Sequence, residues 1–317
     1  MPPVYSGVRL LLVAKFNLRY HRTGIALRDA LRAMGCEVEC VEERTRGLDG
    51  LLRRSLSRRL ASAIQRHRPD LVLVFKGGSL EPGVIDSLRS VSRARWINWF
   101  PDPPHVLDLS LRIGRAYDRC FIFDTWMVER HRALGRTADY LALGFDPGFY
   151  RPLPDGRGPH ARISFVGSNE PHRAKALEAL DGLGLSVRGP GWPGGPLFGD
   201  DLVRFVSNSE VSVNIHQFFG EPADGGCYGT GANQRVFELS GVGTVQLADA
   251  KADIARHFEE DLEIVLCRSA AELRAQALRL LAAPEEARAI AARARARALR
   301  EHTWRHRLDQ LLTVSLQ

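Results

Sequence analysis

A glycine-rich segment followed by a helix start is the part of the sequence best suited to hold an anion. Four glycines stand among residues 225–231, and glycine lets a backbone approach a ligand closely. Asn233 is a good N-cap, so the positive end of a helix would face whatever the segment covers. Arg235 lies in the first turn, where a basic residue opposes the helix dipole unless an anion lies nearby. Glu238 offers a carboxylate that suits paired sugar hydroxyls such as those of ribose.

A second candidate is Phe165-Val-Gly-Ser, which ends at Ser168 and precedes Arg173. A strand, then small residues such as Gly167 and Ser168, then a helix start presents backbone N–H groups to a phosphate. Arg173 would add a bidentate, charge-assisted contact. Both candidates have a simpler alternative: a tight turn with a solvated arginine here, and an ordinary amphipathic helix behind a loop at Asn233.

A third candidate is Trp99-Phe-Pro-Asp-Pro-Pro-His, which ends at His105. It follows a buried strand, and the prolines hold the backbone in an extended shape. Asp102 is a candidate general base for an acceptor hydroxyl, and His105 is its rival. The alternative is that Asp102 only caps the helix after it.

The chemistry of these segments does not require a metal ion. The sequence has no Asp-x-Asp triplet, and arginines with helix ends can neutralise a diphosphate instead. His302 and His306 have a metal-capable spacing but no third ligand nearby. We therefore expect no metal and no cofactor beyond a co-substrate.

The alternation of strand and helix patterns along the sequence indicates where the three candidate segments lie in the fold. Apolar runs of the buried parallel-strand type are separated by stretches with helical spacing, which indicates α/β architecture with a parallel sheet. The strands expected in the first half are 8–14, 37–41, 71–75, 95–99, 120–123 and 140–143, and helices are expected over 24–34 and 51–66. In the second half we expect strands at 163–166, 185–188, 211–215, 244–247 and 263–266, helices at 172–183, 201–207 and 234–239, and helix from 270 onwards.

A segment dense in proline, glycine and charge divides the chain. We predict an N-terminal acceptor-side domain over 1–150, a linker over 151–160, a donor-binding domain over 161–300 and a C-terminal helix over 301–317. Both domains would be Rossmann-like and doubly wound, with the ligand in a cleft between them at the carboxyl ends of the strands.

The composition is that of a soluble globular protein, with 44% hydrophobic and 26% charged residues. No apolar run spans a membrane, and residues 8–14 read as a strand where a signal peptide would begin, so we expect a cytoplasmic protein. The net charge is +7, but four basic residues are lysines and 40 are arginines. Such an excess is typical of a GC-rich genome and does not favour nucleic acid as a partner.

The sequence resembles the spore-maturation-type (CgeB-like) glycosyltransferases, which have the two-Rossmann GT-B fold. The similarity covers about the C-terminal half and rests on motifs ending at Ser168, Arg173, His216 and Glu238, with Gly241 and Gly243 and the tail from His302. The resemblance implies that this half binds a nucleoside diphosphate sugar, with Arg173 and Arg235 on the diphosphate and Glu238 on the ribose. It also implies a donor pocket lined by Asn214, His216, Gly229, Thr230, Gly231, Asn233 and Phe237.

One position departs from related retaining enzymes, which carry a second glutamate eight residues before the ribose-binding one. Thr230 occupies it here, so retention of anomeric configuration is not implied. We expect a metal-independent, hexosyltransferase-type enzyme that moves a sugar from its nucleotide donor to an unidentified acceptor hydroxyl. One alternative is a non-catalytic nucleotide- or sugar-binding protein. The other is a glycosyltransferase acting on DNA or another polyanion through the arginine-rich helical segment of residues 51–68.

Overall fold

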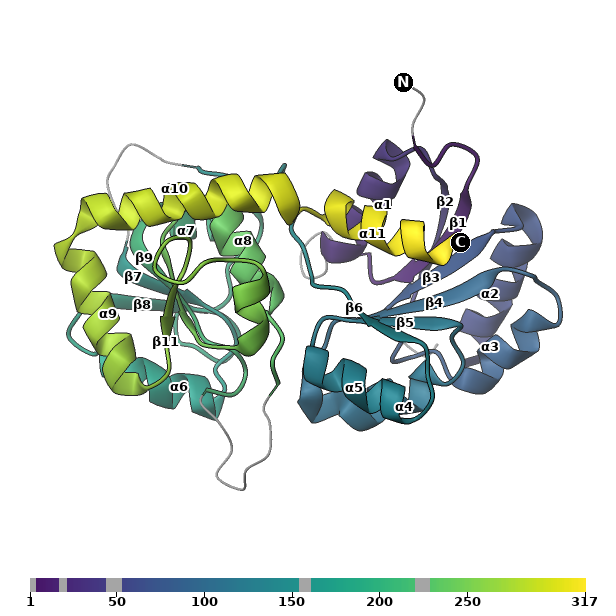
Figure 1. Cartoon of the computed structure of the whole chain (residues 1–317), viewed down its shortest axis with the longest axis horizontal. Helices are drawn as coiled ribbons and strands as arrows, with labels where there is room; N and C mark the ends of the chain where they lie inside the picture. Colours follow the sequence, from purple (N-terminus) through teal and green to yellow (C-terminus); the bar gives the residue numbers. More distant parts are fainter. Residues whose placement is uncertain (1–3, 17–21, 44–52, 154–160, 220–228) are drawn as a thin grey trace. The chain divides into compact units, whose positions relative to one another are not determined.

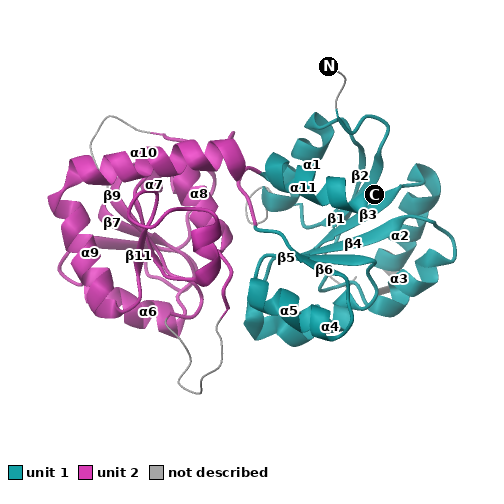
Figure 2. Cartoon of the chain, viewed as in Figure 1, with its two compact units in different colours: residues 1–142, 304–317 teal, residues 143–303 magenta. Residues whose placement is uncertain are grey.

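The computed structural model describes residues 4–16, 22–43, 53–153, 161–219 and 229–317 (Figure 1). It divides into two units (Figure 2). Unit 1 comprises Met1–Ala142 and Trp304–Gln317, and unit 2 comprises Leu143–Thr303. Each unit has its own sheet and core.

Unit 1 is a six-stranded parallel sheet with the strand order β2-β1-β3-β4-β5-β6. The strands are β1 (Arg9–Ala14), β2 (Glu37–Glu42), β3 (Leu71–Phe75), β4 (Arg95–Phe100), β5 (Arg119–Ile122) and β6 (Ala138–Tyr140). The helices are α1 (Arg22–Ala33), α2 (Arg53–His67), α3 (Pro82–Arg89), the 3-10 turn η2 (Pro104–Val106), α4 (Leu107–Gly114), α5 (Thr125–Ala133) and α11 (Trp304–Ser315). The central strands β1, β3 and β4 are buried apart from one end residue each, as their continuous apolar runs predict.

Unit 2 is a five-stranded parallel sheet with the order β11-β10-β9-β7-β8. The strands are β7 (Ala161–Val166), β8 (Leu185–Arg188), β9 (Ser209–Asn214), β10 (Gln246–Asp249) and β11 (Val265–Cys267). The helices are α6 (Pro171–Leu177), the 3-10 turns η3 (Glu178–Leu180) and η4 (Ala252–Arg256), α7 (Gly199–Ser207), α8 (Gln234–Val242), α9 (Ala270–Ala282) and α10 (Pro284–Glu301). The predicted pair of Rossmann-like, parallel-sheet domains is confirmed.

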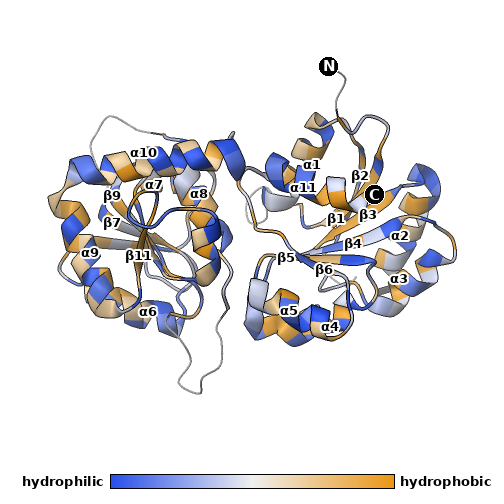
Figure 3. Cartoon of the chain, in the orientation of Figure 1, coloured by the Kyte–Doolittle hydropathy of each residue, from blue (hydrophilic) through white to orange (hydrophobic). Residues whose placement is uncertain are grey.

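Hydropathy explains how the helices lie on the sheets. Apolar and polar residues alternate around many helices of both units, which gives those helices one face for the core and one for solvent (Figure 3). Ile85 and Leu88 of α3, for example, are buried, whereas Asp86 and Ser87 between them are exposed. Helix α8 differs, because its residues from Val236 to Val242 are all buried.

The helical prediction from residue 270 onwards is confirmed, and the chain contains two breaks there, the second of them close to the predicted start of the C-terminal helix at residue 301. Pro284 opens α10, since proline cannot continue the preceding helix. A second break at His302 and Thr303 separates α10 from α11, and α11 belongs to unit 1. The Tyr5 hydroxyl donates to Asp309 (2.9 Å) and Arg95 donates to the Ser315 carbonyl (2.7 Å).

Most predicted strands overlap the observed ones within two or three residues. The strand predicted at 140–143 lies instead at Ala138–Tyr140, because pairing with β5 ends where β5 ends. The predicted domain boundary after residue 150 differs from the observed division, which assigns residues 143–150 to unit 2 and α11 to unit 1.

We expect Gly241→Ala to lower the free energy of unfolding by about 1–3 kcal/mol, the usual cost of overpacking a core. A Cβ at Gly241 would overlap the Phe145 ring and lie 3.0 Å from the Tyr150 carbonyl oxygen. Gly83→Ala is the matched control, because that helical glycine has open space around it and alanine favours a helix. Thermal denaturation of both variants checks this, and equal melting temperatures would contradict the packing described here.

Candidate functional site

The first turn of α8 is held by an interlocked pair of asparagines. Asn233 is the N-cap, and its side-chain oxygen accepts from the Val236 backbone N–H at 3.1 Å. Its amide also exchanges two hydrogen bonds with Asn214, the last residue of β9, at 3.0 and 3.1 Å. The two residues named from the sequence therefore lie together at the carboxyl edge of the sheet.

His216 continues this network into the core. Its Nε2 lies 3.1 Å from the Asn233 backbone nitrogen, and its Nδ1 lies 2.6 Å from Asp249 Oδ1. Asp249 ends β10 and is 2% exposed, with the Lys251 ammonium 3.9 Å from its other oxygen. Sequence reasoning missed Asp249. Its position at the end of a strand neighbouring β9 is the signal that could have found it.

Arg173 lies in the first turn of α6, after β7. Its Nε donates to the Ile215 carbonyl (3.0 Å) and its Nη1 to the Ser168 hydroxyl (2.8 Å). A guanidinium has five N–H donors, so three remain that have no partner among the described residues. Burial lowers the pKa of Arg173, and the positive charge of Arg235 lowers it further. The two arginines therefore share one electrostatic environment.

Gly167 leaves room for this arrangement. A Cβ at Gly167 would lie 2.9 Å from the Phe165 ring and 3.5 Å from Arg173 Nη1. The Gly167 carbonyl accepts from the Trp192 indole N–H at 3.0 Å. The glycine is therefore required by close packing at the turn that carries Ser168.

Arg235 and Glu238 form an ion pair one turn apart, with Nη1 and Oε2 separated by 2.8 Å. Gln234 donates to the other Glu238 oxygen at 2.6 Å, and the Glu238 side chain is only 6% exposed. Burial lowers the pKa of Arg235, but Glu238 and the Tyr150 hydroxyl raise it by more. A basic residue in the first turn of a helix opposes the helix dipole unless an anion lies nearby. In this structure the Glu238 carboxylate is that anion for Arg235.

Phe237 and the end of the glycine segment have different surroundings. Phe237 is fully buried against the rings of His257, Phe258 and His302 in the core of unit 2. The Thr230 hydroxyl donates to the Asp253 carboxylate at 2.9 Å, and Gly229 has a left-handed backbone (φ 105°), as does Gly243 at the end of α8. Gly231 lies between Thr230 and the N-cap, whereas the glycines at 225 and 226 lie outside the described residues.

In unit 1, Asp102 forms an ion pair with Lys76, at 2.7 Å between Oδ2 and Nζ. The alternative role of Asp102 as a helix cap is not observed, because Pro103 occupies the N-cap of η2. His105 lies in η2 and is exposed. Lys76 directly follows β3 and has a left-handed backbone (φ 73°), a conformation that costs free energy for a residue with a side chain.

Charged residues directly follow the neighbouring strands of unit 1 as well. Lys15 follows β1, and Glu43 follows β2 with 2% exposure and its Oε1 accepting from the Ser79 N–H at 3.0 Å. Burial raises the pKa of the Glu43 carboxyl, although Lys15 and Lys76 oppose that shift. Since β2, β1, β3 and β4 are adjacent, Glu43, Lys15, Lys76 and Asp102 share one edge of the sheet.

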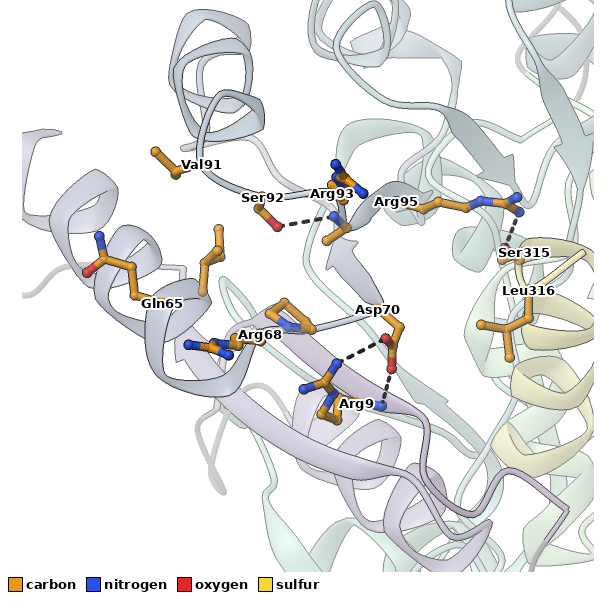
Figure 4. A pocket seen from close by; sticks show the side chains of 13 residues that line it. Arg9, Gln65, Arg68, Asp70, Val91, Ser92, Arg93, Arg95, Ser315 and Leu316 are labelled. Carbon is orange, nitrogen blue, oxygen red and sulfur yellow. Dashed lines mark hydrogen bonds and ion pairs between the residues drawn. The ribbon is translucent and has the colours of Figure 1, made fainter.

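A hollow of about 740 Å³ at the opposite edge of this sheet has a basic lining that includes Arg9, Arg68, Arg93 and Arg95 (Figure 4). Arg9 pairs with Asp70 at 3.4 Å, and Arg95 donates to the Ser315 carbonyl at the end of α11. Arg68 follows the last residue of α2, where a cation stabilises the negative end of a helix. The Asp70 carboxylate, the Ser315 carbonyl and the negative end of α2 thus stabilise Arg9, Arg95 and Arg68 within unit 1.

The described ranges hold no group of three or more His, Cys, Asp or Glu side chains placed to bind one metal ion. Among the helices that the structure describes, none is long and apolar enough to cross a membrane. Positive charge at the carboxyl edge of unit 2 comes instead from Arg173, Arg235 and Lys251.

The architecture is the GT-B glycosyltransferase fold. Sucrose-phosphate synthase from Thermosynechococcus elongatus superposes with a TM-score of 0.68 at 13% identity, covering 97% of this chain and 98% of that chain. HepE from Anabaena, solved in complex with UDP and glucose, gives 0.66 at 12% identity over 96% and 98%. The lipopolysaccharide outer core galactosyltransferase WaaB gives 0.61 at 12% identity over 97% and 99%.

Sequence comparison also relates the second half of the chain to glycosyltransferases. Residues 172–313 match the profile of a family described as glycosyl transferase-like. This segment begins beside Arg173 and includes β9, α8 and β10, the elements that carry the network around Asn233. A comparison with curated protein sequences gives no match.

We expect Glu43→Gln to stabilise the protein increasingly as the pH rises from about 4.5 towards neutrality. The pKa of Glu43 is raised in the folded chain above its ordinary 4.5, so the folded state binds a proton there more readily than the unfolded state. The contribution of Glu43 to the free energy of unfolding therefore falls across that interval, and the neutral glutamine escapes this loss.

Urea denaturation at a series of pH values measures the difference between the variant and the wild type. Glu37→Gln on the exposed end of the same strand is the matched control and should show no such trend. A difference for Glu43→Gln that is independent of pH, or that shrinks towards neutrality, would contradict the burial argument.

Proposed function

We propose that this protein is a glycosyltransferase that moves a sugar from a nucleoside diphosphate to an acceptor hydroxyl. The observation that carries the proposal is Arg173, a half-buried guanidinium that is fixed by Ile215 and Ser168 and has three N–H donors without a partner among the described residues. Such a group is pre-organised for a phosphate. The glycosyl transferase-like profile and the GT-B fold support the same activity.

The transfer needs negative charge to be stabilised on the leaving group. As the bond between the sugar C1 and the diphosphate oxygen breaks, both bonding electrons stay with the nucleoside diphosphate. Arg173, Arg235 and the N-terminal end of α8 would stabilise that charge, because donors fixed in advance do not have to reorient during the reaction. Uridine diphosphate is the nucleotide to test first, since HepE was solved with it.

Asp102 is the proposed base in unit 1. One of its oxygens is paired with Lys76. The other forms no hydrogen bond with a described residue and would take the proton of the acceptor hydroxyl as the hydroxyl oxygen bonds to C1. The side chain is 25% exposed, so a substrate can reach it. His105, exposed in the neighbouring turn, is the alternative base.

Five finer assignments belong to the same proposal. The arginines and helix end neutralise the diphosphate, so the reaction is metal-independent. Glu238 would bind the ribose after its contacts with Arg235 and Gln234 rearrange. The transferred sugar is a hexose, the enzyme is of the CgeB-like type, and it works in the cytoplasm.

Arg173→Ala should weaken binding of UDP by about 10- to 150-fold while leaving the already weak binding of uridine nearly unchanged, because charge-assisted hydrogen bonds are worth about 1.5–3 kcal/mol. Isothermal titration calorimetry measures both ligands. Arg274→Ala is the control, since that arginine also donates to backbone carbonyls in unit 2 but on the exposed surface. Equal losses for UDP and uridine would point to a folding defect instead of a lost phosphate contact.

Asp102→Asn should reduce kcat by about 10²–10⁴-fold with UDP affinity near the wild-type value, because a carboxamide cannot accept the proton. Donor turnover by the purified protein is the measurement, with His105→Ala assayed beside it. Full activity of Asp102→Asn combined with loss in His105→Ala would move the base to the histidine.

Turnover should persist in excess EDTA, because the proposal gives the charge of the diphosphate to arginines and a helix end. The same assay with and without added Mg²⁺ or Mn²⁺ tests this. Complete loss in EDTA with recovery on adding either ion would overturn the metal-free mechanism.

A further inference from the structure

The hydrogen bonds around His216 determine which ring nitrogen carries the proton. The Asn233 backbone N–H can only donate, so His216 Nε2, 3.1 Å away, must accept with its lone pair. The proton of the neutral ring then lies on Nδ1, which donates to Asp249 Oδ1 at 2.6 Å. The ring therefore bridges Asp249 and the first turn of α8, so that Asp249 fixes the orientation of this turn through the ring.

Asp249 is well placed to hold this bridge rigidly. The same carboxylate oxygen also accepts from the His216 backbone N–H at 2.8 Å, so two bonds fix one residue. Lys251, with a side chain 3% exposed, lies 3.9 Å from the other oxygen. A buried carboxylate is tolerated because it is compensated in this way.

The bridge decides which N–H groups of the helix start remain for a ligand. The Asn233 N–H already donates to His216, and the Val236 N–H already donates to the Asn233 side chain. The backbone N–H groups of Gln234 and Arg235 lie between them in the first turn, where a helix has no internal acceptor. Within the described ranges, no acceptor is bonded to the backbone N–H of Arg235.

We propose that Asp249 is a positioning residue for the donor: through the His216 ring it fixes Asn233 and thereby aims the Arg235 backbone N–H at the donor diphosphate, beside the unspent donors of Arg173. The inference rests on the proposed function for the identity of the ligand. Asp249 touches no ligand itself. Without it, the ring can take the Nε2–H tautomer, which would place one N–H against another and release Asn233.

Two substitutions at His216 separate its two hydrogen bonds. His216→Gln retains an acceptor near the Nε2 position for Asn233, whereas His216→Asn retains a donor near the Nδ1 position for Asp249. We expect His216→Asn to bind UDP at least tenfold more weakly than His216→Gln, measured by calorimetry with UDP. The reverse order, or equal affinities, would overturn the proposal.

The tautomer itself is tested without any ligand. Long-range ¹H–¹⁵N NMR of the wild type should show His216 protonated on Nδ1 alone. Asp249→Asn keeps an acceptor oxygen and should keep that tautomer, whereas Asp249→Ala should give a mixture of tautomers and at least tenfold weaker UDP binding. If Asp249→Ala does not fold, as its amide spectrum will show, the His216 pair carries the test.

The outcomes separate this inference from the proposed function. A wild-type ring protonated on Nε2 would overturn the bridge while leaving UDP binding intact. A wild-type protein with the expected tautomer that binds neither UDP nor inorganic pyrophosphate would overturn the proposed function, and the role of Asp249 in donor binding with it.

Discussion

The hydrogen bond from the Asn233 backbone to His216 ties the start of α8 to the ends of β9 and β10. A helix start leaves backbone N–H groups without partners inside the helix, so its direction decides what those groups can bind. Here it is held by Asn214, His216 and Asp249, residues from two neighbouring strand ends. Arg173 follows β7, the next strand along, and is fixed by Ile215, which directly follows β9. The proposed diphosphate contacts therefore depend on parallel strands ending at one edge.

Unit 1 uses the same edge of its sheet for a different set of charges. The Lys76–Asp102 pair combines a general-base candidate with a lysine whose backbone is in a strained, left-handed conformation. Strain of this kind persists only where surrounding contacts enforce it. The Asn98 side chain, which donates to the Lys76 carbonyl at 3.1 Å, is one such contact.

The sequence was sufficient to predict the sheets because buried parallel strands are continuous apolar runs. It also predicted Asn233 as a cap and placed Arg173 in a first turn, since both follow from local rules. It could not predict the partners of these residues. The Arg235–Glu238 pair, the burial of Phe237 and the role of Asp249 depend on which strands become neighbours, and strand order is not encoded locally. A separate C-terminal helix from residue 301 was predicted, but the break before α10 was not, because the alanine- and arginine-rich composition favours helix on both sides of Pro284.

A crystal structure of the protein soaked with UDP tests whether unit 2 binds a nucleoside diphosphate at the start of α8. We expect diphosphate oxygens within hydrogen-bond distance of the Arg173 guanidinium and of the Arg235 backbone nitrogen, with His216 still bridging Asp249 and Asn233. A diphosphate bound at Lys76 in unit 1 or in the arginine-lined hollow, with Arg173 left without a ligand, would contradict this expectation.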